Sequence, residues 1–153
     1  LHSRHDMSLF KDLETSGSSP ALEQMLRFSG ARQRLLVHNI ANMDTPDFIS
    51  LDVSPQAFQQ QLAKAVNARR EHNGGQQGDL HIESTDEVTI SGDGAMTLTP
   101  QSTSNNVMYH DRNNRDLERM MQALAENGLA FRTATELLRR NHDLLRSAIS
   151  QRP

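Results

Sequence analysis

Two stretches of the chain place apolar side chains at helical spacing. The first covers residues 20–43, where apolar or small residues recur every three or four positions, and this period predicts an amphipathic helix. Ser19 and Pro20 provide a cap and a first-turn proline. The apolar stripe of this helix is expected to consist of Leu22, Met25, Leu26, Ser29, Gln33, Leu36, Val37 and Ile40.

The second stretch covers residues 107–153 and has a stricter period. One column of large apolar residues repeats every seven positions over more than four heptads, which is typical of a coiled-coil seam. A C-terminal helix over this range would therefore present a continuous apolar edge to a partner helix. The column consists of Leu117, Leu124, Phe131, Leu138 and Leu145.

Both predicted helices carry more apolar surface than one seam requires. Phe28 and Leu35 flank the first stripe, and Leu137 and Leu144 flank the second. A two-helix hairpin needs only one narrow seam per helix, so these flanks predict further helices, from the same molecule or from neighbours. The column next to the heptad leucines is expected to be Met121, Gly128, Thr135, His142 and Ile149.

The segment between the two helices has a different composition. Residues 44–66 predict a turn and a short helix after Pro55. Residues 67–106 contain only eight apolar residues in forty, which predicts an irregular segment. Within it, apolar residues alternate on both sides of S-G-D-G, and this pattern favours a small β-hairpin at 86–99.

The expected fold is therefore mainly α. The helices at 20–43 and 107–153 would pair as an antiparallel coiled-coil hairpin around an irregular middle segment. Residues 1–19 are expected to form a flexible N-terminal segment. The six residues before Met7 are interpreted as an expression scar or an upstream start, without structural weight.

Composition narrows the functional classes. Apolar residues make up 35% of the chain, against about 45–50% in globular proteins on a count that includes glycine, so part of the core is expected to come from another molecule. A net charge of −3 with both signs interspersed argues against a nucleic-acid partner. The absence of cysteine excludes thiol chemistry. No secretory signal or membrane span is recognisable, so any export would use a route that does not read such a signal.

The first predicted helix ends in an unusually specified stretch, N-I-A-N-M-D-T-P-D-F at 39–48. Asn42 can adopt the left-handed conformation that ends helices, and Thr45-Pro46 prevents helix re-entry. Phe48 can then fold back on the apolar stripe. These rules leave Asn39 unexplained, and its carboxamide can satisfy backbone groups of the turn or of a neighbour.

This stretch resembles the N-terminal signature of the flagellar rod and hook proteins, N-I-A-N-x-x-T-P-x-[aromatic]. Asp47 replaces the glycine that is usual in the family, and Phe48 stands where tyrosine is frequent. The segment D-L-E-R-M-M-Q-A-L-A-E-N-G-L-A-F at 116–131 is similar to the family's C-terminal helix, and the short chain resembles its proximal rod members. The matching signature residues are Asn39, Ile40, Ala41, Asn42, Thr45, Pro46 and Phe48.

The resemblance implies a structural subunit of the bacterial flagellar basal-body rod, in the periplasmic space. Such a subunit assembles helically with related rod proteins, transmits torque and surrounds the export channel. It is exported by the flagellar type III apparatus without a cleaved signal peptide. The implied partners are other rod proteins, the junction protein joining rod to membrane ring, the export gate and further copies of the chain.

The same interpretation assigns no catalytic, cofactor-binding or metal-binding residue and no small-molecule substrate. The signature residues would shape the helix end and the following turn. The helix seam is expected to be Leu26, Leu36, Leu117, Leu124, Phe131, Leu138 and Leu145.

Two alternatives belong to other functional classes. A soluble coiled-coil adaptor or chaperone-like binder would use the same heptads and form a stable dimer. A small metal-dependent enzyme would draw its ligands from His81, Glu83 and His110. No H-E-x-x-H, G-x-S-x-G or phosphate-binding glycine loop is present, which disfavours catalysis.

Overall fold

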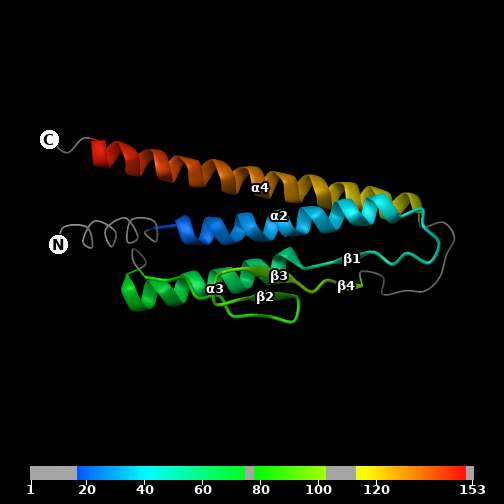
Figure 1. The fold of residues 1–153 in the computed structure, drawn as a ribbon, viewed down its shortest axis with the longest axis horizontal. Helices are drawn as coiled ribbons and strands as arrows, with labels where there is room; N and C mark the ends of the chain where they lie inside the picture. The colour runs from blue at the N-terminus through cyan, green and yellow to red at the C-terminus, as the bar shows by residue number, and fades with distance from the viewer. Residues whose placement is uncertain (1–16, 75–77, 103–112, 151–153) are drawn as a thin grey trace.

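The computed structural model describes residues 17–74, 78–102 and 113–150 (Figure 1). This part of the chain is mainly helical, as the sequence predicted. Two short antiparallel strand pairs accompany three helices. In chain order the elements are α2 (Ser19–Asn42), β1 (Leu51–Asp52), α3 (Pro55–Asn73), β2 (Val88–Ile90), β3 (Met96–Leu98), β4 (Gln101–Ser102) and α4 (Asn113–Ser150).

Helices α2 and α4 pack together along most of the length of α2 and run in opposite directions (Figure 1). Asn127 of α4 donates to the Ser29 carbonyl and to the Gln33 side chain, both at 2.8 Å. Further along, Asn141 donates to the Ser18 hydroxyl at 3.0 Å. These two asparagines fix which residues of the helices face one another.

The second column of α4 differs from the expected one. The side chains that accompany the heptad leucines toward α2 follow three residues after them, at Asn127, Ala134 and Asn141. The expected column, four residues after the leucines, is largely exposed, and Met121 and Ile149 are 53% and 51% accessible. Residues three positions after the leucines and residues four positions after them both repeat every seven positions. The sequence pattern predicts the second column because it is the more apolar of the two. The polar column faces α2 because both asparagines find hydrogen-bond partners there.

Helix α3 is longer than predicted. The expectation of irregular structure from residue 67 is wrong for residues 67–73, which continue the helix. Alanine, arginine and glutamate in this stretch are good helix formers despite their polarity. The helix ends at Gly74 (φ 67°), whose amide donates to the Arg70 carbonyl at 3.0 Å.

The ends of α2 also differ from expectation. The capping residue is Ser18 rather than Ser19, and its side chain makes no capping hydrogen bond. The helix closes at Met43, with a right-handed φ of −62°. At the start of α3, by contrast, the Ser54 hydroxyl accepts a hydrogen bond from the Ala57 amide at 3.1 Å.

The predicted hairpin occurs as β2 and β3, which pair antiparallel with Val88 opposite Leu98. A second pair joins β1 to β4, with Leu51 opposite Ser102. Both pairs and α3 lie on the side of α2 away from α4 (Figure 1). Helix α2 is therefore the middle layer of the molecule.

The hydrophobic core lies between α2 and this second layer. Its buried members are Phe28, Val53, Phe58 and Val88. Phe28 and Phe58 stack with their ring centroids 4.1 Å apart. The flank of α2 that the sequence left without a partner is thus covered by α3 and the hairpin of the same molecule. None of the helices in the described ranges combines the length and apolar character that a membrane crossing requires.

Candidate assembly site at the end of the first helix

The signature stretch forms two consecutive turns after α2. The Thr45 amide donates to the Asn42 carbonyl at 2.9 Å, and the Phe48 amide donates to the Thr45 carbonyl at 3.2 Å. In the second turn Pro46 occupies the position that fixes φ near −65°, and Asp47 follows with φ 60°. Proline followed by a positive φ is typical of a type II turn. This turn explains why the family signature has glycine where this chain has Asp47.

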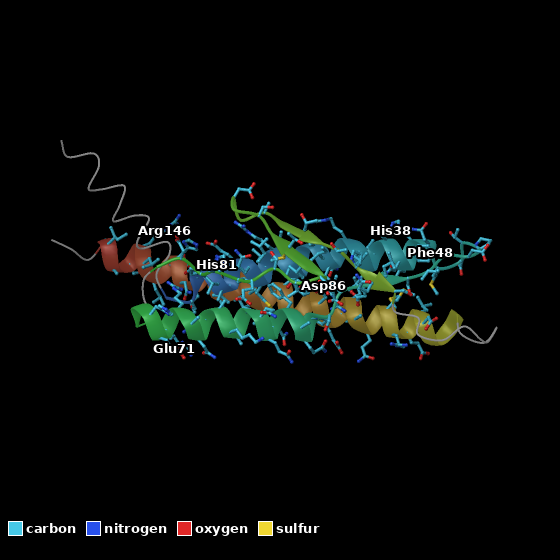
Figure 2. All side chains as sticks on the ribbon, turned by 90° about the horizontal axis from the view of Figure 1, so that it is seen from below. His38, Phe48, Glu71, His81, Asp86 and Arg146 are labelled. Atoms are coloured by element: carbon cyan, nitrogen blue, oxygen red, sulfur yellow. The ribbon has the colours of Figure 1, made fainter. Side chains whose placement is uncertain are left out.

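Asn42 does not adopt the expected left-handed conformation. Asp47 is the non-glycine residue with a positive φ in the described ranges. The Asn42 carboxamide instead donates to the His38 carbonyl at 2.8 Å, one turn back, and this bond is compatible with a helical backbone. Phe48 does fold back on α2, as expected. It contacts the His38 ring edge to face, with the ring centroids 5.9 Å apart (Figure 2), and not the apolar stripe.

Asn39 joins the helix to the strand that follows the turns. Its carboxamide nitrogen donates to the Leu51 carbonyl at 2.6 Å, and its oxygen accepts from the Leu51 amide at 3.4 Å. The residue is 2% exposed. The side chain therefore pairs with both backbone groups of Leu51, much as a neighbouring strand would.

A buried ion pair lies two turns earlier on the same face of α2. Arg32 donates to the two carboxylate oxygens of Asp52 at 2.9 and 2.6 Å, and the side chains are 7% and 19% exposed. One Asp52 oxygen also accepts from the Val53 amide at 2.8 Å. The bidentate geometry suits arginine in particular. With Asn39, this pair fixes the path of residues 51–53 along α2.

Sequence reasoning missed Arg32, Asp52 and Asn127. Arg32 is surrounded by a pattern that suggests a polar surface position, and Asp52 lies twenty residues away, so no local spacing indicates the pair. Asn127 interrupts an apolar helix, and that interruption is a detectable signal, because a polar residue in a seam usually fixes register.

The predicted seam residues are buried to different degrees. Leu36 is buried, and the other leucines of this set are partly buried. Phe131 is 39% exposed, and its ring lies over Gly30 of α2. Of the remaining signature residues, Ile40 is partly buried, and Ala41, Thr45 and Pro46 are exposed.

The residues considered for a metal site do not form one among the described residues. His81 and Glu83 are both exposed, and His110 lies outside the described ranges. Within those ranges no three His, Cys, Asp or Glu side chains gather as a metal site would require.

Comparison with known proteins finds one informative relative. The chain is 26% identical over 149 residues to the flagellar basal body rod protein FlgB of Bacillus subtilis (strain 168), and the match covers 94% of this chain and 98% of the relative. No family model matches the chain, and no solved structure does. The match confirms the resemblance to flagellar basal-body rod proteins, because it extends well beyond residues 39–48.

Proposed function

We propose that this chain, as a relative of the flagellar basal-body rod proteins, is a structural subunit of the proximal rod. The observation that carries the proposal is a similarity that spans nearly the whole length of both proteins. In this role the subunit assembles helically with related rod proteins and further copies, transmits torque and surrounds the export channel. It acts through shape and contact surfaces and performs no catalysis.

The pattern of exposed apolar residues supports assembly with neighbours. Five large apolar side chains of α4 are at least 44% exposed, although the helix also provides the seam for α2. Two of them, Leu137 and Leu144, lie seven residues apart on one face of the helix, and an exposed apolar patch of this kind is typical of interaction surfaces. The five side chains are Met121 at 53%, Leu129 at 63%, Leu137 at 44%, Leu144 at 62% and Ile149 at 51%.

In this proposal α2 and α4 act as an antiparallel coiled-coil hairpin. The contacts of Asn127 and Asn141 with α2 support the pairing and its direction. The seam would comprise Leu26 and Leu36 of α2 with the heptad column of α4. The low apolar content makes an isolated subunit marginal in stability, so assembly and final ordering would be coupled.

We assign the signature residues a positioning role in the same subunit. Asn39 and the two turns at 42–48 set the angle at which the chain leaves α2, and this fixes where β1 and α3 begin. Export without a cleaved signal peptide, and contacts with the rod–membrane-ring junction protein and the export gate, belong to the proposal through the family resemblance.

Mass spectrometry of purified hook–basal bodies, before and after the membrane rings are stripped, tests the proposal. The chain is expected to remain with the rod after stripping. Its absence from well-covered basal bodies would reject the rod assignment and favour a soluble coiled-coil adaptor. Light scattering of the purified protein then separates the two classes further, because the adaptor is expected to be a stable dimer at micromolar concentration.

A further inference from the structure

The residues at the start of α2 form hydrogen bonds with two other helices, α3 and α4. Arg69 of α3, 7% exposed, donates to the Gly17 carbonyl at 2.9 Å. Asn141 of α4 donates to the Ser18 hydroxyl at 3.0 Å. Gly17 has a φ of 65°, which interrupts helical geometry just before α2 begins. The residues that precede Gly17 therefore start from a fixed position beside both α3 and α4.

Two exposed leucines of α4 lie on either side of this position. Leu137 and Leu144 are 44% and 62% exposed, and they are four residues before and three residues after Asn141. Ala130, one heptad before Leu137, lines a recess together with Pro55 and other residues of α3. Because residues seven apart share a helix face, the two leucines lie on the side of α4 nearer α3. They are thus close to the point where the N-terminal segment begins.

The sequence before Gly17 has the chemistry to cover these leucines. Residues 7–16, M-S-L-F-K-D-L-E-T-S, contain four large apolar residues, at Met7, Leu9, Phe10 and Leu13, and their two acidic residues outnumber the single Lys11. On α4, Arg140 is exposed and stands three residues after Leu137 and four before Leu144, so it lies next to both. An apolar segment with acidic residues complements this surface.

We propose that residues 7–16 dock on the surface formed by Leu137, Arg140 and Leu144 of the same molecule. Leu137 and Leu144 lie within about 6 Å of Asn141 along the helix axis, whereas ten residues can span about 33 Å. The short tether gives the segment an effective concentration in the millimolar range at this site. A second copy in dilute solution therefore competes poorly for it. In the isolated chain the docked segment shields two leucines that a neighbour would otherwise contact.

The absence of native cysteine permits a direct test on the full chain. Leu13→Cys combined with Leu144→Cys should form an intramolecular disulfide under diamide, which accepts the two hydrogens released by the thiols. The matched control combines Leu13→Cys with Leu129→Cys. Leu129 is 63% exposed and Leu144 is 62% exposed, but Leu129 lies fifteen residues earlier, about 22 Å away along the helix axis, so accessibility is matched and only position differs.

Crosslinking of the Leu13–Leu144 pair at least about tenfold faster than the control pair is expected from the local concentration. Equal rates would overturn the proposal. Disulfide-linked dimers in place of the crosslinked monomer would also overturn it and would identify a second copy as the occupant. Non-reducing gels with intact-mass measurement distinguish these outcomes.

Hydrogen exchange supplies a second readout. Leu144→Glu should increase amide exchange in residues 7–16 by at least about fivefold if it weakens the docked state by about 1 kcal/mol, whereas Leu129→Glu should not change it. Unaltered exchange with Leu144→Glu would contradict docking. Both experiments use the isolated chain, so their outcome is independent of whether the chain is found in basal bodies.

Discussion

Helices α2 and α4 have similar sequence patterns but different surroundings. Each carries an apolar seam and an apolar flank. The seam of α2 meets α4, and its flank, centred on Phe28, meets α3 and the hairpin. The seam of α4 meets α2, but Leu137 and Leu144 on its flank remain 44% and 62% exposed in the described structure. One helix is covered on two sides and the other on one.

This difference shows that amphipathic width and burial are separate properties. The width of the apolar arc indicates how much helix surface is favourable to bury. It does not indicate whether the same chain or a neighbouring molecule buries that surface. For α2 the cover is α3, which the sequence pattern presents as a short polar helix with few apolar positions. For α4 we assign the cover to residues 7–16 in the isolated chain and to neighbours in the rod.

Truncation of one flank residue on each helix tests the contrast most strongly. Phe28→Ala removes a stacked ring that is 2% exposed and should lower the free energy of unfolding by about 4 kcal/mol. Leu137→Ala should change it by less than about 1 kcal/mol, because this side chain is 44% exposed in the described structure and its proposed contact with residues 7–16 is weak. Urea unfolding followed by circular dichroism measures both. Similar losses would show that the two flanks are equally buried.

The ion pair on the covered side of α2 is expected to give the next largest effect. Arg32→Met leaves the Asp52 carboxylate partly buried without its partner, and unfolding should become about 3 kcal/mol easier. Arg34→Met, two residues away at an exposed position, is the matched control and should stay within about 0.5 kcal/mol of the parent. Thermal unfolding of the three proteins checks the difference. A loss that is seen at low salt and disappears at high salt would argue against a buried pair, because salt screens exposed pairs.

Substitution of the buried signature asparagine should cost more stability than substitution of the exposed one. Asn39→Ala removes both hydrogen bonds to Leu51 from a buried site and should reduce stability by about 2 kcal/mol. Asn42→Ala removes an exposed bond to the His38 carbonyl and should cost about 0.5 kcal/mol. Chemical denaturation gives both values. Equal effects would mean that the pairing with β1 contributes little.

The smallest effect is expected at the second turn. Asp47 holds a φ of 60°, which glycine adopts without strain. Asp47→Gly should therefore stabilise the protein by about 0.5 kcal/mol, and Asp47→Ala at the same position should destabilise it by about 1 kcal/mol. Differential scanning calorimetry resolves shifts of this size. A loss of stability with glycine would show that the Asp47 side chain contributes more than its backbone strain removes.

The features predicted from the sequence are those that depend on local periodicity. Residues 20–43 and the heptads of α4 show a clear 3.6-residue period, and helices occur there. The alternation around S-G-D-G is likewise local, and β2 and β3 pair within the predicted range. The extension of α3 to Asn73 was missed because polar composition was taken as evidence for a loop, although helix propensity depends little on polarity in this stretch.

The features that escaped prediction depend on contacts distant in sequence. Arg32 and Asp52 are twenty residues apart, and the partners of Asn127 lie more than ninety residues away. Neither spacing follows from a helical or strand period. For Asn39 the sequence indicates a carboxamide at the edge of the apolar stripe, with no local hydrogen-bond partner. Identifying its partners, both backbone groups of Leu51, required the path of the chain after the turns.

The two asparagines of α4 also determine how the helix pair responds to mechanical shear. Asn127 and Asn141 stand two heptads apart, about 21 Å along the axis, and each is bonded to a different part of α2. Sliding α4 along α2 must break both attachments together, and the next register of the heptads lies about 10 Å away. Between these points the pair should behave as a single stiff element. Beyond them, at 142–150, α4 can bend away from α2 without disturbing either bond.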